Sequence, residues 1–90
     1  MKDRNKIITQ LLIVGEEYDL EIIKINFTNI NNIMDEVEFT FKIKDNKFII
    51  KYLYEKDNMY DVNSVGYNIK NKLGELLKEG KECLNYLWIY

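Results

Sequence analysis

Residues 37–54 have the sequence VEFTFKIKDNKFIIKYLY, and this stretch decides the fold. Apolar and aromatic residues alternate with polar ones before Asp45-Asn46, and they occupy every second position, 48, 50, 52 and 54, after it. Strict alternation is typical of a strand with one buried face. Asp and Asn are frequent in tight turns because their side chains bond the nearby backbone and tolerate left-handed conformations. The stretch therefore predicts a β-hairpin that turns at Asp45-Asn46.

A turn at Asp45-Asn46 also sets the register expected for the two strands. It places four apolar pairs opposite each other on one face: Ile43–Phe48, Phe41–Ile50, Phe39–Tyr52 and Val37–Tyr54. Cross-strand pairs of this kind stabilise antiparallel sheets. A slip by one residue would turn charged side chains into the core, so the alternation favours this register.

The residues before the hairpin predict a helix, then a strand. Residues 5–14 have helical spacing of Ile and Leu, although their β-branched content also permits a strand. Asp3 or Asn5 is the expected N-cap, and Gly15 is the expected residue after the helix. Residues 18–28 alternate as a strand. Their apolar parity changes once near residues 22–23, which predicts a β-bulge.

The residues after the hairpin predict a second helix from about Asp61, with Asp61 or Ser64 as its cap and Gly80 at its end. Gly66 and Gly74 inside it indicate close packing on the sheet. Residues 81–90 fit either a further helical turn or an edge strand. The chain is therefore expected to be one α+β domain over residues 1–90, with a three-stranded antiparallel sheet and both helices on one face.

Composition argues against most catalytic chemistry. The chain has no His and a single Cys among its 90 residues, so His-dependent nucleophiles and ordinary zinc sites are excluded. Its four glycines are scattered, so no phosphate-binding loop is present. The pair Asp35-Glu36 is interpreted as a solvated turn, and Cys83 as a buried, inert thiol. We expect a protein that is not an enzyme and that needs no cofactor or metal.

The sequence also predicts a cytoplasmic protein. The longest apolar run, residues 11–15, is far shorter than the roughly 18–20 residues of a membrane span. The basic N-terminus is followed by Glu16-Glu17 instead of a cleavage site for a signal peptide. A solitary cysteine fits a reducing compartment.

Charge is unevenly distributed along the chain, although the net charge is only −2. Residues 16–38 contain seven acidic residues and one lysine, whereas residues 42–56 contain five lysines and two acidic residues. Such segregation can steer a charged partner, and ordinary solubilising charge is the alternative. The candidate partner-binding residues are Glu16, Glu17, Asp19, Glu21, Asp35, Glu36, Glu38 and Tyr60. The candidate nucleic-acid face is Lys42, Lys44, Lys47 and Lys51.

Tyrosines outside the hairpin are a second signal of binding. Tyr60, Tyr67, Tyr86 and Tyr90 are not all needed for the core, and tyrosine is a frequent anchor in protein interfaces. Trp88 is expected to belong to the core.

By length, element order, the acidic residues 16–38 and the hairpin 37–54, the chain resembles the small anti-CRISPR proteins, particularly the α-β-β-β-α inhibitors of Cas9. Its composition, rich in Asn, Ile, Lys and Tyr, is that of an AT-rich genome such as those of many low-GC bacteria and their phages. The resemblance implies a protein partner, a CRISPR effector nuclease, whose DNA binding or cleavage would be blocked in the host cytosol. No family residue is carried over, because no specific motif is shared.

Two other functions remain open from the sequence. Double-stranded-RNA-binding domains share the α-β-β-β-α order, and Lys70 and Lys72 near the start of the last helix would add to the lysine face. An acidic net charge argues against that function. An immunity or antitoxin protein needs the same kind of surface as an inhibitor, and homodimerisation through the apolar tail is compatible with each function.

Overall fold

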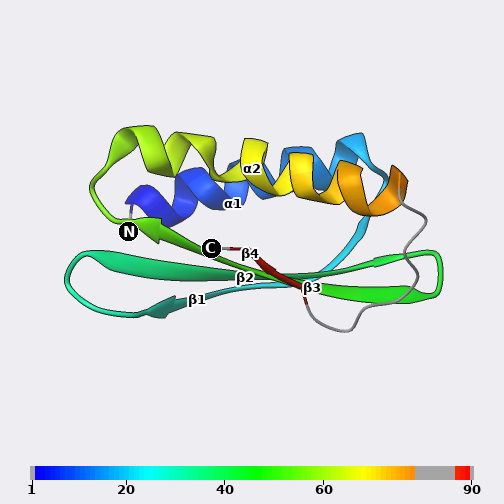
Figure 1. Cartoon of the computed structure of the whole chain (residues 1–90), viewed down its shortest axis with the longest axis horizontal. Helices are drawn as coiled ribbons and strands as arrows, with labels where there is room; N and C mark the ends of the chain where they lie inside the picture. The colour runs from blue at the N-terminus through cyan, green and yellow to red at the C-terminus, as the bar shows by residue number, and fades with distance from the viewer. Residues whose placement is uncertain (1, 79–86, 90) are drawn as a thin grey trace.

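A computed structural model describes residues 2–78 and 87–89. It confirms the α+β class, with two helices on one face of an open sheet (Figure 1). The elements are α1 (Lys2–Glu17), β1 (Glu21–Asn29), β2 (Met34–Ile43), β3 (Asn46–Glu55), α2 (Met59–Lys78) and β4 (Leu87–Ile89). The sheet order is β1-β2-β3-β4, with β1, β2 and β3 antiparallel and β4 parallel to β3.

One core lies between the helical layer and the sheet. α1 and α2 run in the same direction and bury one stripe each, while β2 and β3 bury one parity of their residues (Figure 1). The buried core residues are Ile7, Leu11, Val14, Val37, Phe39, Phe41, Phe48, Ile50, Tyr52, Tyr54, Val62, Val65, Ile69 and Leu73. The predicted apolar face of the hairpin is therefore confirmed.

The predicted register of the hairpin is wrong by two residues. The turn consists of Lys44-Asp45, and Lys44 has a φ of 56°, in the left-handed region. Phe41 therefore lies opposite Phe48, and their rings stack with centroids 5.4 Å apart. A shift by two keeps every side chain on its face, so alternation alone does not exclude it. The observed register also places Lys51 opposite Glu38, its ion-pair partner.

Strand β1 follows its prediction more closely. Its pairing with β2 shifts between Ile22 and Lys24, which confirms the predicted bulge. The bulge leaves Ile23 exposed, while Ile25 and Phe27 pack against the core. The strand begins at Glu21, three residues later than predicted, because the chain turns at Asp19 with a φ of 54°.

Both helices start earlier than predicted, and the expected caps are wrong. α1 begins at Lys2 and continues past Gly15 to Glu17, so Gly15 lies inside the helix. A Cβ on Gly15 would lie 2.7 Å from Ile22 Cδ1, so a larger residue at this position would displace the tip of the Ile22 side chain. Asn58 caps α2, since its Oδ1 accepts a hydrogen bond from the Asp61 backbone N–H at 3.1 Å.

The C-terminal region is described only at β4. Its three residues pair with residues 50–52 of β3, which agrees with the edge-strand alternative for the tail. The expectations for Gly80, Cys83, Tyr86 and Tyr90, and for the side chain of Trp88, lie outside the described part of the structure. Within that part, neither helix has the length and apolarity required to cross a bilayer.

Candidate functional site

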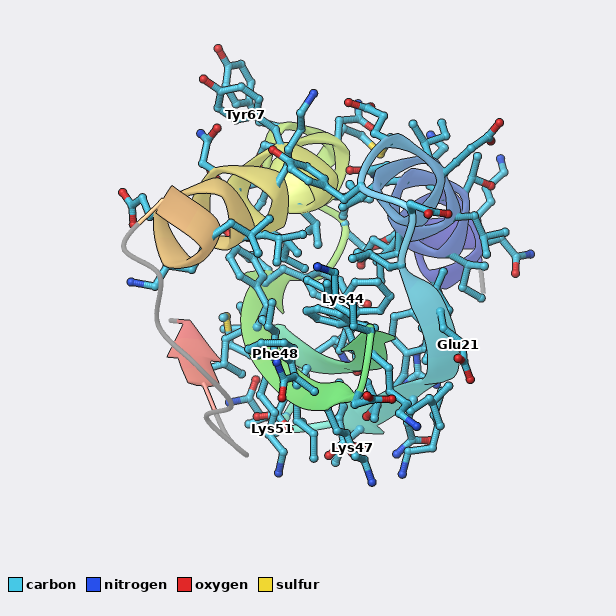
Figure 2. The ribbon with its side chains drawn as sticks, turned by 90° about the vertical axis from the view of Figure 1, so that its right-hand side faces the viewer. Glu21, Lys44, Lys47, Phe48, Lys51 and Tyr67 are labelled. Atoms are coloured by element: carbon cyan, nitrogen blue, oxygen red, sulfur yellow. The ribbon has the colours of Figure 1, made fainter. Side chains whose placement is uncertain are left out.

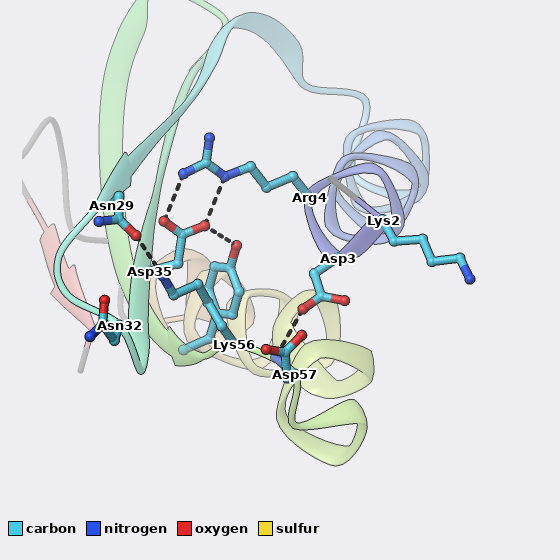
Figure 3. Close-up of a pocket in the computed structure, with 9 residues that line it drawn as sticks. Lys2, Asp3, Arg4, Asn29, Asn32, Asp35, Lys56 and Asp57 are labelled. Carbon is cyan, nitrogen blue, oxygen red and sulfur yellow. Dashed lines mark hydrogen bonds and ion pairs between the residues drawn. The ribbon is translucent and has the colours of Figure 1, made fainter.

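A charged cluster joins the start of α1 to the sheet (Figure 3). The Arg4 guanidinium donates from Nε and Nη2 to the two oxygens of Asp35, both at 2.9 Å. The Tyr54 hydroxyl donates to Asp35 Oδ2 at 2.5 Å from the neighbouring strand. The Arg4 side chain also lies over the Phe27 ring, 5.2 Å from its centroid. Arg4, Asp35 and Tyr54 form what we call the Arg4 cluster.

Each member of the Arg4 cluster stays in one protonation state near neutral pH. Burial raises the pKa of Asp35, but hydrogen bonds from Arg4 and Tyr54 outweigh burial and hold that pKa below its usual value. Burial and the hydrogen bond to Asp35 raise the pKa of Tyr54. The hydrogen bond to Asp35 raises the pKa of Arg4. A general acid or base needs a pKa near the working pH, so the cluster is not suited to proton transfer.

The Arg4 cluster forms the floor of a cavity of about 560 Å³ at the end of the molecule where both helices begin. Its other lining residues are Lys2, Asp3, Asn29, Asn32, Lys56 and Asp57. Lys56 Nζ donates to Asn29 Oδ1 at 2.5 Å, and Asp3 Oδ2 accepts from the Asp57 N–H at 3.0 Å. The first contact ties the loop before α2 to the end of β1, and the second ties that loop to the start of α1.

Asp35 is the largest departure from the predicted acidic surface. It is 1 % exposed and shares the inward parity of Val37 and Phe39, so the expectations of a solvated turn and of an exposed partner-binding acid are wrong. An Asp35 with both oxygens bonded has no contact to offer a partner. Charge reversal at this position would disrupt the core instead of testing a surface.

The other predicted acids do not form one face. Glu16, Glu17, Asp19 and Glu21 lie where α1 ends and β1 begins, at the end of the molecule opposite to Asp35. Glu36 and Glu38 lie on the sheet face away from the helices, where Glu38 contacts Lys24 at 3.3 Å and Lys51 at 3.8 Å. Glu38 and Glu36 lie opposite Asn26 and Thr28 of β1, so five to seven residues of that strand, roughly 17–23 Å, separate them from Glu21.

The four candidate lysines are also divided. Lys42 and Lys47 lie directly opposite each other on the outer face of the sheet, with Lys51 further along β3. Figure 2 shows Lys47 and Lys51 pointing away from the helices, whereas Lys44 extends from the turn toward them. Among the described residues, Lys42, Lys44 and Lys47 have no ion-pair partner. Lys70 and Lys72 are paired with Glu17 and Glu75 in the helical layer.

An exposed aromatic surface lies on the solvent side of the helices. Tyr60 and Tyr67, seven residues apart on α2, are 90 % and 66 % exposed. Tyr67 projects from the helical layer into solvent (Figure 2). Ile13 of α1, 51 % exposed, lies with Tyr67 along a groove of about 260 Å³ between the helices. We call Ile13, Tyr60 and Tyr67 the helical face.

The groove has a rigid floor because the two helices interlock there. The Gln10 side chain donates from Nε2 to the Val62 carbonyl and accepts from the Gly66 N–H, both at 2.8 Å. A Cβ on Gly66 would lie 2.8 Å from Gln10 Cβ, so only glycine permits this approach. Gly66 therefore packs against α1, and its predicted packing on the sheet is wrong. Gln10, together with Arg4, was missed from the sequence, since neither stands out by type or spacing.

Comparison of the chain with family models, curated proteins and solved structures gives no match. The resemblance to anti-CRISPR proteins therefore rests on the length, the element order and the charge pattern of this chain, and on no matched protein.

Proposed function

We propose that this protein acts by binding another protein through the helical face, as an inhibitor or regulator and not as an enzyme. The observation that carries the proposal is the exposure of Tyr60 and Tyr67 on one side of α2, with Tyr67 beside Ile13 along the interhelical groove. Large apolar side chains gathered on a protein surface are typical of interaction sites.

The chemistry of tyrosine supports recognition at this surface. Its ring supplies a large apolar contact area and its hydroxyl a hydrogen bond, while only two side-chain torsions are fixed on binding. Tyr60 and Tyr67 stand on a helix that is anchored to α1 through Gln10 and through the ion pair of Lys70 with Glu17, at 2.6 Å. A preformed surface of this kind loses little conformational entropy when a partner docks.

The properties of the cavity support binding over catalysis. The Arg4 cluster is locked in one protonation state by its own hydrogen bonds. The chain also lacks histidine, the commonest general base at neutral pH. Among the described residues, no group of three or more acidic or cysteine side chains could hold a metal.

A CRISPR effector nuclease is the partner that the resemblance implies, and we retain it as the proposed target. The separation of Glu16 and Glu17 from Glu36 and Glu38 favours a steric block over imitation of DNA by an acidic surface. A toxin enzyme, as for an immunity or antitoxin protein, is the alternative target. The ion pairs of Lys70 and Lys72 weigh against a mode of binding like that of double-stranded-RNA-binding domains.

The test is a capture experiment in which the tyrosines are varied. The tagged protein is exposed to a lysate of the organism that carries the gene, and the captured proteins are identified by mass spectrometry. The main captured protein is then purified and titrated against the wild type and Tyr60→Ser/Tyr67→Ser. We expect affinity to fall at least about 30-fold, which corresponds to about 2 kcal/mol, because the loss of a single anchor residue costs that much or more.

Ile33→Ser is the matched control, since Ile33 is 61 % exposed but lies in the β1–β2 loop, away from the helical face. It should bind like the wild type. A partner whose affinity survives loss of both tyrosines, or falls equally in the control, would contradict the proposal. A partner lost instead on reversal of Glu16 and Glu17 to lysine would assign binding to the acidic residues at the end of α1.

A further inference from the structure

The cavity over the Arg4 cluster has features that the protein-binding proposal does not use. Its volume of about 560 Å³ is within the usual range for small-molecule sites. Its floor holds a bidentate ion pair in which Asp35 is 1 % exposed. A buried ion pair is seldom more stabilising than apolar residues of the same size, so its presence under a cavity calls for another explanation.

The charges around the cavity are sorted to opposite sides. Figure 3 shows the Asp3 and Asp57 carboxylates side by side next to the start of α1, and Lys2 extending away from them. Asn29, Asn32 and Lys56 lie on the other side of the Arg4 cluster (Figure 3). The cavity therefore has one wall with carboxylates and another with an ammonium group and two amides.

The acidic wall has unused binding capacity. Among the described residues, Asp3 and Asp57 have no ion-pair partner, although Asp3 accepts the Asp57 N–H. Two neighbouring carboxylates without a cation repel each other, and an ammonium group between them would relieve that repulsion.

The opposite wall is rich in hydrogen-bond donors. The Lys56 ammonium group has three N–H donors, and Asn29 accepts from one of them. The backbone N–H of Lys56 donates to the Ile33 carbonyl at 2.7 Å, which holds Lys56 near Asp35. The Asn32 side chain adds an exposed amide. A carboxylate is the group that an ammonium and amide N–H donors bind best.

We infer that this cavity binds a small zwitterion, an α-amino acid or a dipeptide, with its ammonium group on Asp3 and Asp57 and its carboxylate on Lys56 and Asn32. The Arg4 cluster is the rigid floor that fixes the two walls. The inference is independent of the helical face, which lies on the solvent side of the helices.

The test uses the full chain labelled with ¹⁵N and a fixed set of probes: the twenty amino acids, glycylglycine, acetate and methylammonium. Amide shifts are followed during titration to about 10 mM. We expect at least one zwitterion to cause saturable shifts at residues lining the cavity, while acetate and methylammonium cause none. Lys56→Gln and Asp57→Asn should each weaken binding at least about tenfold. Asparagine tolerates the φ of 60° at position 57, so Asp57→Asn should keep the fold intact.

Lys47→Gln and Asp45→Asn are the matched controls, because they make the same chemical changes in the hairpin, at the opposite end of the molecule. They should bind the zwitterion like the wild type. Absence of saturable shifts at the cavity with every zwitterion would overturn the inference. Equal binding of acetate or of methylammonium alone would also overturn it, since a single-charge site would then be sufficient. Glycylglycine binding without any free amino acid would identify a dipeptide as the source of the zwitterion.

Discussion

The two ends of the molecule treat their charges in opposite ways. At the end with the Arg4 cluster, Arg4 and Asp35 are paired, and acidic residues accept backbone N–H groups near both helix starts, where the helix dipole favours them. At the end with the hairpin turn, α1 finishes in Glu16 and Glu17 with no basic residue in its last turn, and Lys42 faces Lys47.

The difference indicates at which end the charged residues stabilise the folded protein and at which end they do not. Carboxylates at the C-terminus of a helix and lysines directly opposite in a sheet each oppose folding slightly. Of Glu16, Glu17, Lys42 and Lys47, Glu17 alone has an ion-pair partner within the described part of the chain, namely Lys70. We therefore expect charge removal to destabilise the protein at the Arg4 end and to leave it unchanged or more stable at the hairpin end.

The largest effect is expected for Asp35→Ala. It leaves the Arg4 guanidinium half-buried without a counter-ion and the Tyr54 hydroxyl without an acceptor. Breaking one partner of such a pair costs about 3 kcal/mol, measured as the free energy of unfolding in urea at pH 7. Asp45→Ala, at the exposed turn, should change it by less than about 0.5 kcal/mol. Equal stability of the two variants would remove the contrast between the ends.

The stability difference between the wild type and Asp35→Ala should depend on pH. Because the pKa of Asp35 is lowered in the folded state, the unfolded chain binds its proton first as the pH falls. The stabilisation by Asp35 is thus fully present above its ordinary pKa of about 4 and is lost as the pH falls through the folded-state pKa. The gap between wild type and Asp35→Ala should therefore be constant from pH 6 to 8 and narrow below about pH 4. A gap that widens in acid would contradict the assigned role.

A smaller effect, of opposite sign, is expected at Thr40 on the outer face of β2. Thr40 is 3 % exposed, and its hydroxyl has no hydrogen-bond partner among the described residues. Thr40→Val keeps the shape and removes the unsatisfied group, so it should stabilise the protein by about 1 kcal/mol in thermal or urea unfolding. Thr28→Val, at an exposed position of β1, is the control with little effect. Destabilisation by Thr40→Val would show that the hydroxyl is bonded after all.

The sequence predicted which face of each hairpin strand is buried better than it predicted the register between the strands. Alternation identified which hairpin residues are buried, because the period of two is a property of any strand. It could not distinguish registers that differ by two residues, and only the turn decides between them. The turn uses Lys44 at a positive φ, a conformation for which lysine has no preference, so composition pointed to Asp45-Asn46 instead.

The Arg4 cluster was only partly within reach of sequence reasoning. Asp35 has the same parity as Val37, Phe39 and Phe41, and this signal of an inward carboxylate was available. Its partner Arg4 is 31 residues away on a helix, and no periodicity connects the two. The predicted acidic residues do not form one site for a related reason. Strand β1 lies between the acidic residues at the end of α1 and those of β2, so residues close in sequence are far apart in space.

The smallest expected effect tests the lysine pair itself. Lys47→Glu converts the like-charged pair with Lys42 into an opposite-charged one and should stabilise the protein by about 0.5 kcal/mol at low salt. Lys51→Glu on the same strand breaks the ion pair with Glu38 and should destabilise it by a similar amount. Both differences should shrink in 1 M NaCl, where screening is nearly complete at these distances. If Lys47→Glu instead destabilises the protein, Lys47 has a favourable role in the fold, and the hairpin end is no longer the end where charge opposes folding.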